Sequence, residues 1–153
     1  MKLQLILANL ELSSVLWIDN DIVLFENVVP ELEKIQKPIV IQNDGWSPCT
    51  GFMLLRPTKA VKDLLRQAIA IMDANLNYND QHAMADLLRA KCHLLDEEEY
   101  PNGKVYFEEK RTSKAKMVHN NYLSTTEDKI WRFKQNSLWS SNFDMSKVNV
   151  HEL

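Results

Sequence analysis

Cysteine, long apolar runs and clustered positive charge are all scarce in this sequence, and each absence excludes a class of protein. The two cysteines, Cys49 and Cys92, lack the spacing of a metal motif, so neither a disulfide framework nor a thiolate metal site is predicted. No apolar run is long enough to span a bilayer. The apolar start, residues 2–12, contains Glu11 and no small-residue cleavage site, which is typical of a packed helix rather than a signal peptide. A net charge of −3 without a basic stripe argues against nucleic acid as a partner.

The remaining composition is that of one soluble globular domain. Apolar residues make up 45% and charged residues 25% of the 153 positions, which suffices for a single core. We expect a domain at residues 1–139 and a loosely held tail at 140–153. We also expect a soluble chain without a membrane segment, cytoplasmic, or in the Golgi if it is part of a longer protein.

Helical and strand patterns alternate along the chain. Helices are expected at residues 2–12, from Pro30, at 58–72 behind a Thr58 cap, from Asp80 and at 127–137. Strands are expected at residues 15–18, 38–42 and 52–55, and within "CHLLD", "KVYFE" and "KMVH". This alternation predicts an α/β domain with a mostly parallel sheet flanked by helices, in which ligands bind beyond the carboxyl ends of strands.

Two acids interrupt the first strand pattern, "VLWIDNDIVLFEN", at Asp19 and Asp21. One interpretation is a pair of solvated turn acids. An EF-hand loop also begins with D-x-D, but Val23 and Leu24 stand where that loop needs a ligand and a glycine. The third interpretation is a divalent-cation site, because two carboxylates at a strand end can hold a hard cation that binds a phosphate.

Two families place D-x-D after an apolar strand, and "DNDIV" fits both. Phosphatases of the haloacid dehalogenase type should also carry a glycine-containing acidic motif towards the C-terminus. The acidic run at residues 96–99, "DEEE", contains no glycine, and the chain has only three glycines. The other family is the GT-A glycosyltransferases, and the remainder of the chain has to separate the two.

The later motifs favour the glycosyltransferases. In order, "VLWIDNDIVLFENV", "CTGFMLLRPT", "YNDQHAMADLL", "VYF" and "HNNYLSTTEDKIWRF" resemble nucleotide-diphospho-sugar transferases over residues 2–139. The sequence is most similar to the family with plant xylosyl- and arabinosyltransferases, and more distantly to glycogenin-like enzymes. The resemblance implies a GT-A-like, Rossmann-like fold. It also implies metal-dependent transfer of a sugar, with retention, from a UDP-sugar to a hydroxyl of a glycan, protein or small-molecule acceptor.

The resemblance also implies a metal site. Asp19 and Asp21 match the acids that hold Mn²⁺ or Mg²⁺, and Asp19 also matches a contact to the donor ribose. His119 matches the distant histidine that completes the site, and its imidazole favours Mn²⁺ over Mg²⁺. The alternative for His119 is a hydrogen-bonded core histidine.

Five further residues match donor or catalytic positions. Lys129 matches a residue that contacts the donor pyrophosphate, with a solvated helix lysine as the alternative. Gly51 matches the glycine that lets backbone approach the sugar, and Asp44 is assigned to donor binding. Asp80 and Gln81 match the catalytic pair beside the donor sugar, although Asp80 alone could serve a helix N-terminus.

The sequence departs from the family pattern in two places. Cys49 stands where the family usually has Asn. The D-x-D begins at Asp19, whereas family members usually have a much longer segment before it, which forms the nucleoside pocket. We therefore expect the C-terminal part of a GT-A domain that, alone, is weak or inactive, distinguishes UDP poorly from GDP and self-associates. A Mg²⁺-dependent phosphatase and a non-catalytic remnant remain the alternatives.

Overall fold

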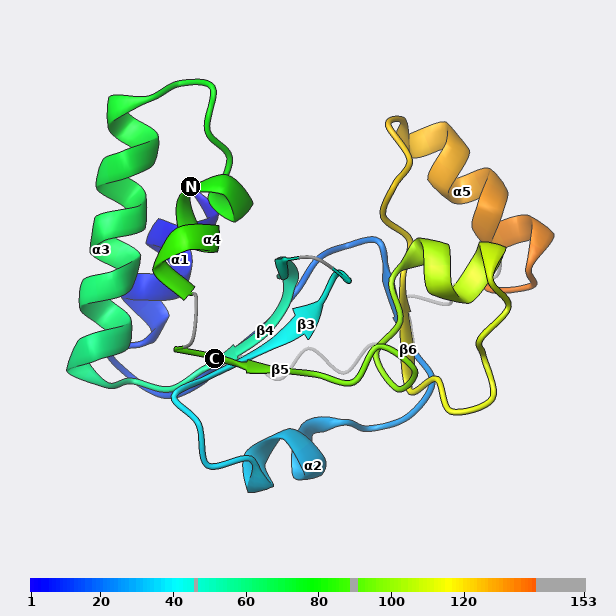
Figure 1. Cartoon of the computed structure of the whole chain (residues 1–153), viewed down its shortest axis with the longest axis horizontal. Coiled ribbons are helices and arrows are strands. Elements are labelled where there is room, and N and C mark those ends of the chain that lie inside the picture. The colour runs from blue at the N-terminus through cyan, green and yellow to red at the C-terminus, as the bar shows by residue number, and fades with distance from the viewer. Residues whose placement is uncertain (46, 89–90, 140–153) are drawn as a thin grey trace, which may run out of the picture.

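The computed structural model describes residues 1–45, 47–88 and 91–139, and it contains two sheets with helices around them (Figure 1). Trp46 and the expected tail at 140–153 lie outside the described residues. The larger sheet has the order β1-β4-β3-β5, and the smaller sheet pairs β2 with β6. The strands are β1 (Val15–Ile18), β2 (Ile22–Leu24), β3 (Ile39–Asn43), β4 (Pro48–Leu55), β5 (His93–Leu94) and β6 (Met117–His119). The helices are α1 (Lys2–Asn9), α2 (Val29–Lys34), α3 (Lys59–Ala74), α4 (Asp80–Leu88), η1 (Lys104–Glu108) and α5 (Thr126–Gln135).

The α/β class is confirmed, but the expected mostly parallel sheet is wrong. Strand β4 pairs antiparallel with both β1 and β3, and β2 pairs antiparallel with β6. Among the described residues, the parallel pairing is that of β3 with β5. The loop at 44–47 is too short for a crossover, so it can only return the chain antiparallel.

The helices begin near their predicted positions. Thr58 caps α3 through its hydroxyl, which accepts a hydrogen bond from the Val61 N–H at 3.2 Å. No helix among the described residues is long and apolar enough to cross a bilayer. The segment "KVYFE", expected to be a strand, is instead the π-helix η1. The Asn102 side chain accepts a hydrogen bond from the Val105 N–H at 3.0 Å, which starts a helical turn at the predicted strand.

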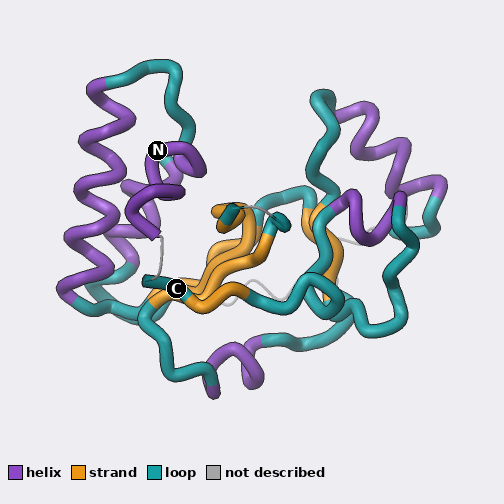
Figure 2. The backbone as a smooth tube through the Cα atoms, viewed as in Figure 1, coloured by secondary structure: helices purple, strands orange, loops and turns teal. Residues whose placement is uncertain are grey.

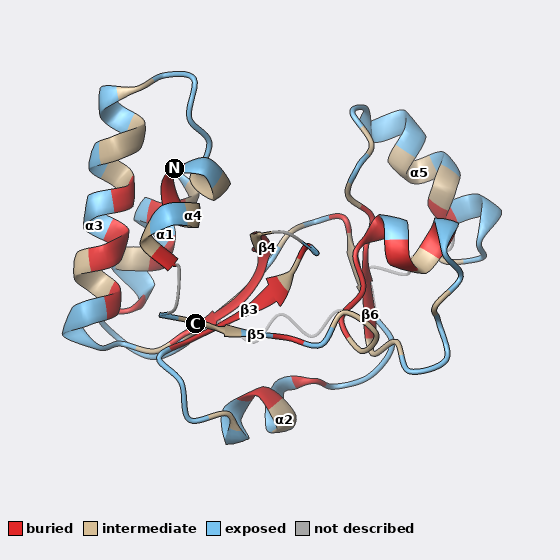
Figure 3. Cartoon of the chain, viewed as in Figure 1, coloured by how far each residue is buried: buried red, intermediate tan, exposed pale blue. Residues whose placement is uncertain are grey.

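The two central strands of the larger sheet, β3 and β4, are buried, as Figure 3 shows. Side chains of β3 alternate between the two faces. Ile39 and Ile41 pack with α1, α3 and α4, which gather on one side of the sheet (Figure 2). Val40 packs on the other side against Leu32 of α2 and Tyr100. A third, smaller cluster joins η1, β6 and α5, so α5 is fixed beside the smaller sheet.

Candidate metal centre and the surrounding cavity

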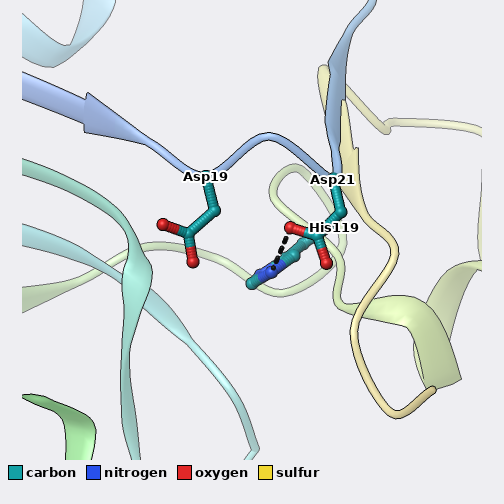
Figure 4. Close-up of side chains that lie close together, drawn as sticks. All are labelled: Asp19, Asp21 and His119. Carbon is teal, nitrogen blue, oxygen red and sulfur yellow. Dashed lines mark ion pairs between the residues drawn. The ribbon is translucent and has the colours of Figure 1, made fainter. Parts of the chain in front are cut away.

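The two acids lie where the chain passes from one sheet to the other. Asp19 directly follows β1 of the larger sheet, and Asp21 directly precedes β2 of the smaller one. The register of β2 with β6 places Ile22 opposite His119, which brings this distant histidine beside Asp21 (Figure 4). Backbone hydrogen bonds fix the crossing, since the Asp19 N–H donates to the Gly51 carbonyl at 2.8 Å. The fold thus assembles a site that spacing along the sequence cannot indicate.

Asp19, Asp21 and His119 converge on one point. One potential ligand atom from each of the three side chains lies within 4.8 Å of the others. The His119 Nε2 atom is 3.3 Å from Asp21 Oδ1. Asp21 and His119 are buried, with 8% and 4% of their surface exposed, while Asp19 is half-buried. Two carboxylates and an imidazole without a thiolate are a donor set that suits Mn²⁺ or Mg²⁺.

Opposite charges surround the buried acid of this cluster. Burial alone would raise the pKa of Asp21, but hydrogen bonds from His119 and Lys129 outweigh it and hold this pKa well below its usual range. The Lys129 Nζ atom is 2.7 Å from Asp21 Oδ2. Burial would lower the pKa of His119, but the interactions with Asp21 and with Cys49 outweigh it and raise this pKa to about 9. His119 and Lys129 therefore compensate the negative charge of Asp21.

A lysine from the first helix joins the metal cluster to α4. Lys2 Nζ lies 3.1 Å from Asp19 Oδ1 and 2.9 Å from Asp80 Oδ2. The Trp17 indole N–H donates to Asp19 Oδ1 at 2.7 Å, and the Thr50 hydroxyl donates to Asp80 Oδ2 at 2.7 Å. Burial of Asp80 opposes its ionisation, but the contacts with Thr50 and Lys2 outweigh this and lower its pKa. These contacts hold both carboxylates in fixed orientations.

One open cavity of about 300 Å³ contains most of the predicted site residues. Asp19, Asp44, Gly51, Asp80, Gln81 and His119 line it, together with Lys2, Cys49, Thr50, Asn79, Asn121 and Tyr122. Asp21 and Lys129 are not among the lining residues and adjoin the cavity through their contacts with His119 and each other. The structure therefore brings all eight predicted residues to one region, from six different elements and loops.

Gly51 provides the space for the His119 ring. A Cβ atom at position 51 would lie 2.4 Å from His119 Cε1 and 3.0 Å from Asp19 Oδ2. The glycine lies where the pairing of β3 with β4 is irregular, because Ile41 pairs with Met53 whereas Gln42 pairs with Cys49. The intervening residues of β4 leave this ladder and carry Gly51 to the cavity.

The loop between β3 and β4 forms another part of the cavity. Asp44 is buried, and its Oδ1 atom accepts a hydrogen bond from Asn121 Nδ2 at 3.1 Å. Tyr122, the residue after Asn121, has a positive φ of 61°, and its hydroxyl donates to the Asp44 carbonyl at 3.4 Å. Gln81 Nε2 lies 3.5 Å from the Ser47 hydroxyl, so α4 also contacts this loop.

Sequence reasoning missed several residues of the site. Lys2 and Trp17 were assigned to an apolar helix and strand, and Thr50 had no role. Gln42, which contacts His119, was seen only as the end of the apolar run "PIVIQ". The polarity of Gln42 could have indicated its role, because a polar side chain at the end of a buried strand needs a hydrogen-bond partner.

The sequence of this chain matches a known family and a curated relative. Residues 1–133 match the model of a family described as nucleotide-diphospho-sugar transferase. A UDP-D-xylose:L-fucose α-1,3-D-xylosyltransferase of Arabidopsis thaliana is 30% identical over 106 residues, which cover 60% of this chain and 29% of the relative. The chain thus spans less than a third of the length of this curated relative.

Solved structures share the fold. The glycosyltransferase GlyE of Streptococcus pneumoniae superposes with a TM-score of 0.59 at 15% identity, over 92% of this chain and 43% of GlyE. A glycosyltransferase involved in glycosylation of the major capsid of PBCV-1 gives a TM-score of 0.63 at 14% identity, over 90% of this chain and 74% of that one. At these identities the likeness shows the fold alone.

Proposed function

This chain belongs to the nucleotide-diphospho-sugar transferase family and has a GT-A-like α/β fold, and from that premise we propose that it transfers a sugar from a UDP-sugar to an acceptor hydroxyl with the help of a divalent cation. The observation that carries the proposal is the convergence of Asp19, Asp21 and His119 within 4.8 Å, inside a fold whose family uses diphosphate donors. The acceptor is a hydroxyl of a glycan, a protein or a small molecule.

The three converging side chains are the residues that would hold the cation. Asp19 and Asp21 supply hard oxygen ligands, and the imidazole of His119 favours Mn²⁺ over Mg²⁺. When bound, the cation would neutralise the negative charge that builds on the leaving nucleoside diphosphate.

Two lysines supply positive charge on either side of the acids. Lys129 contacts Asp21 from α5, and Lys2 contacts Asp19 from α1. An ammonium on a flexible stem can exchange a carboxylate partner for a phosphate oxygen. We assign Lys129 to the donor pyrophosphate, and Gly51 and Asp44 to the donor sugar side of the cavity.

Asp80 and Gln81 form the proposed catalytic pair at the start of α4. Lys2 and Thr50 lower the pKa of Asp80, which makes its carboxylate a poor proton acceptor. A fixed negative charge instead suits stabilisation of the positive charge that develops on the sugar in the transition state. We therefore assign the acceptor proton to the leaving phosphate, which accords with retention of anomeric configuration, and we place Gln81 beside the reacting sugar.

A donor and metal panel tests this function. The name of the Arabidopsis relative suggests UDP-D-xylose as the first donor and L-fucose as the first acceptor. The expected result is a slow release of UDP, in keeping with the weak activity expected from the sequence, that requires Mn²⁺, stops with EDTA and is lost in Asp21→Asn. Glu98→Gln is the control. Glu98 is not among the residues that line the cavity, and it forms ion pairs with Arg111 and Lys114 instead.

The same panel distinguishes the two alternatives. Phosphate release from sugar phosphates without release of UDP would favour a phosphatase and contradict the proposal. No turnover of any UDP-sugar, together with no binding of UDP, would favour a non-catalytic remnant. The anomeric configuration of the transferred sugar, read by NMR, tests retention separately.

A further inference from the structure

Gln42 is a polar residue in the buried core of the larger sheet. It is 0% exposed and follows the apolar residues of β3. The alternation along the strand places its side chain on the face of Val40, towards Tyr100. A buried amide without partners is strongly destabilising, so each of its polar ends needs a hydrogen bond.

The two partners of this amide fix its orientation. Gln42 Nε2 lies 3.1 Å from the backbone carbonyl of Tyr100. Because a carbonyl oxygen can only accept, the amide nitrogen must face it. The amide oxygen Oε1 therefore faces His119, at 2.8 Å from Nδ1.

This orientation determines which nitrogen of His119 faces the acids. The Gln42 oxygen can only accept, so Nδ1 must carry a hydrogen and donate it. The other nitrogen, Nε2, lies 3.3 Å from Asp21 Oδ1, in the cluster that also contains Asp19. Cys49 Sγ also approaches Nδ1, at 3.6 Å, but a thiol is only a weak acceptor.

We propose that Gln42 is a positioning residue that holds a hydrogen on His119 Nδ1 and thereby presents Nε2 as a metal ligand. The inference rests on the proposed metal site and assigns it an outer partner. Metal-bound histidines commonly donate their second N–H to an oxygen, which fixes the tautomer and the ring orientation, and loss of such a partner typically weakens metal affinity about 10- to 100-fold.

The test compares three variants of the full chain with Mn²⁺ alone as the probe. Gln42→Met has a similar shape but no acceptor, and Gln42→Glu retains an oxygen that can accept from Nδ1. Ile41→Met is the matched control, because Ile41 is the buried neighbour in β3 and faces the opposite side of the sheet. Calorimetry measures the dissociation constant of Mn²⁺. Electron spin echo modulation on ¹⁵N-histidine protein detects a nitrogen bonded to the ion, and circular dichroism verifies folding.

The expected result is a dissociation constant raised about 10- to 100-fold in Gln42→Met, with loss of the histidine nitrogen signal. Gln42→Glu and Ile41→Met should retain that signal. A folded Gln42→Met protein with wild-type affinity and nitrogen signal would overturn the role of Gln42. If Gln42→Met does not fold, loss of the signal in folded Gln42→Glu would overturn it. A wild-type protein that binds no Mn²⁺ contradicts the metal site itself, and the role of Gln42 with it.

Discussion

Replacement of Gly51 by alanine should displace the proposed histidine ligand without straining the backbone. The added Cβ would lie 2.4 Å from His119 Cε1, about 1 Å short of ordinary van der Waals contact at 3.4 Å. The imidazole would therefore have to move by about 1 Å, which exceeds the roughly 0.2 Å tolerance of metal–ligand distances. We expect weaker Mn²⁺ binding, by at least about 10-fold, since even loss of an outer partner has that effect. Overpacking should also lower the free energy of unfolding by about 1–3 kcal/mol.

A double-mutant cycle isolates this clash from other effects of the substitution. When His119 is already alanine, the ring that Gly51→Ala would strike is gone. The second substitution should then change the free energy of unfolding, measured by urea denaturation without metal, by less than about 0.5 kcal/mol. Equal destabilisation in both backgrounds would show that something other than the His119 ring occupies this space and would refute the reasoning.

Three further predictions concern the residues around the cluster. The pKa of Asp80 is lowered in the folded chain, so its stabilising effect is present above its unfolded pKa of about 3.9 and is lost as the pH falls through the lower folded value. Wild-type protein should therefore lose more stability than Asp80→Asn between about pH 5 and pH 3 in thermal unfolding, and parallel curves would contradict this. Lys129→Met should weaken UDP binding and make the affinity less dependent on salt concentration, as measured by calorimetry. Lys134→Met, at an exposed position on the same helix, should change neither the affinity nor its salt dependence. Gln81→Ala should lower kcat more than donor affinity, because its effect is expected in the transition state, and an unchanged kcat would remove it from the catalytic pair.

The sequence predicted the helices and strands that depend on residues within the same segment, such as a cap or an apolar pattern. Thr58 and the apolar spacing after it predicted α3, and the run "VLWI" predicted β1. Strand direction was not predictable, because short apolar strands read the same whichever way their neighbours run. The segment "KVYFE" was predicted to be a strand, but the Asn102 side chain favours a helical turn there.

The site was predictable only in part, for a similar reason. The D-x-D pattern marks Asp19 and Asp21 by itself, whereas His119 was found only through the family resemblance, since the register of β2 with β6 brings it close. Lys2 and Gln42 escaped notice because their roles depend on contacts with residues far along the chain. Such contacts leave no periodicity in the sequence.

The most direct test of the central claim is anomalous X-ray diffraction from crystals of the full chain soaked in Mn²⁺. If this site holds a cation, one strong anomalous peak should lie among Asp19, Asp21 and His119. The metal–oxygen distances should be close to the approximately 2.1 Å of comparable hard cations. The same peak should be missing from Asp21→Asn crystals. Its absence from the wild-type cluster, or a peak at another group of carboxylates, would contradict the account.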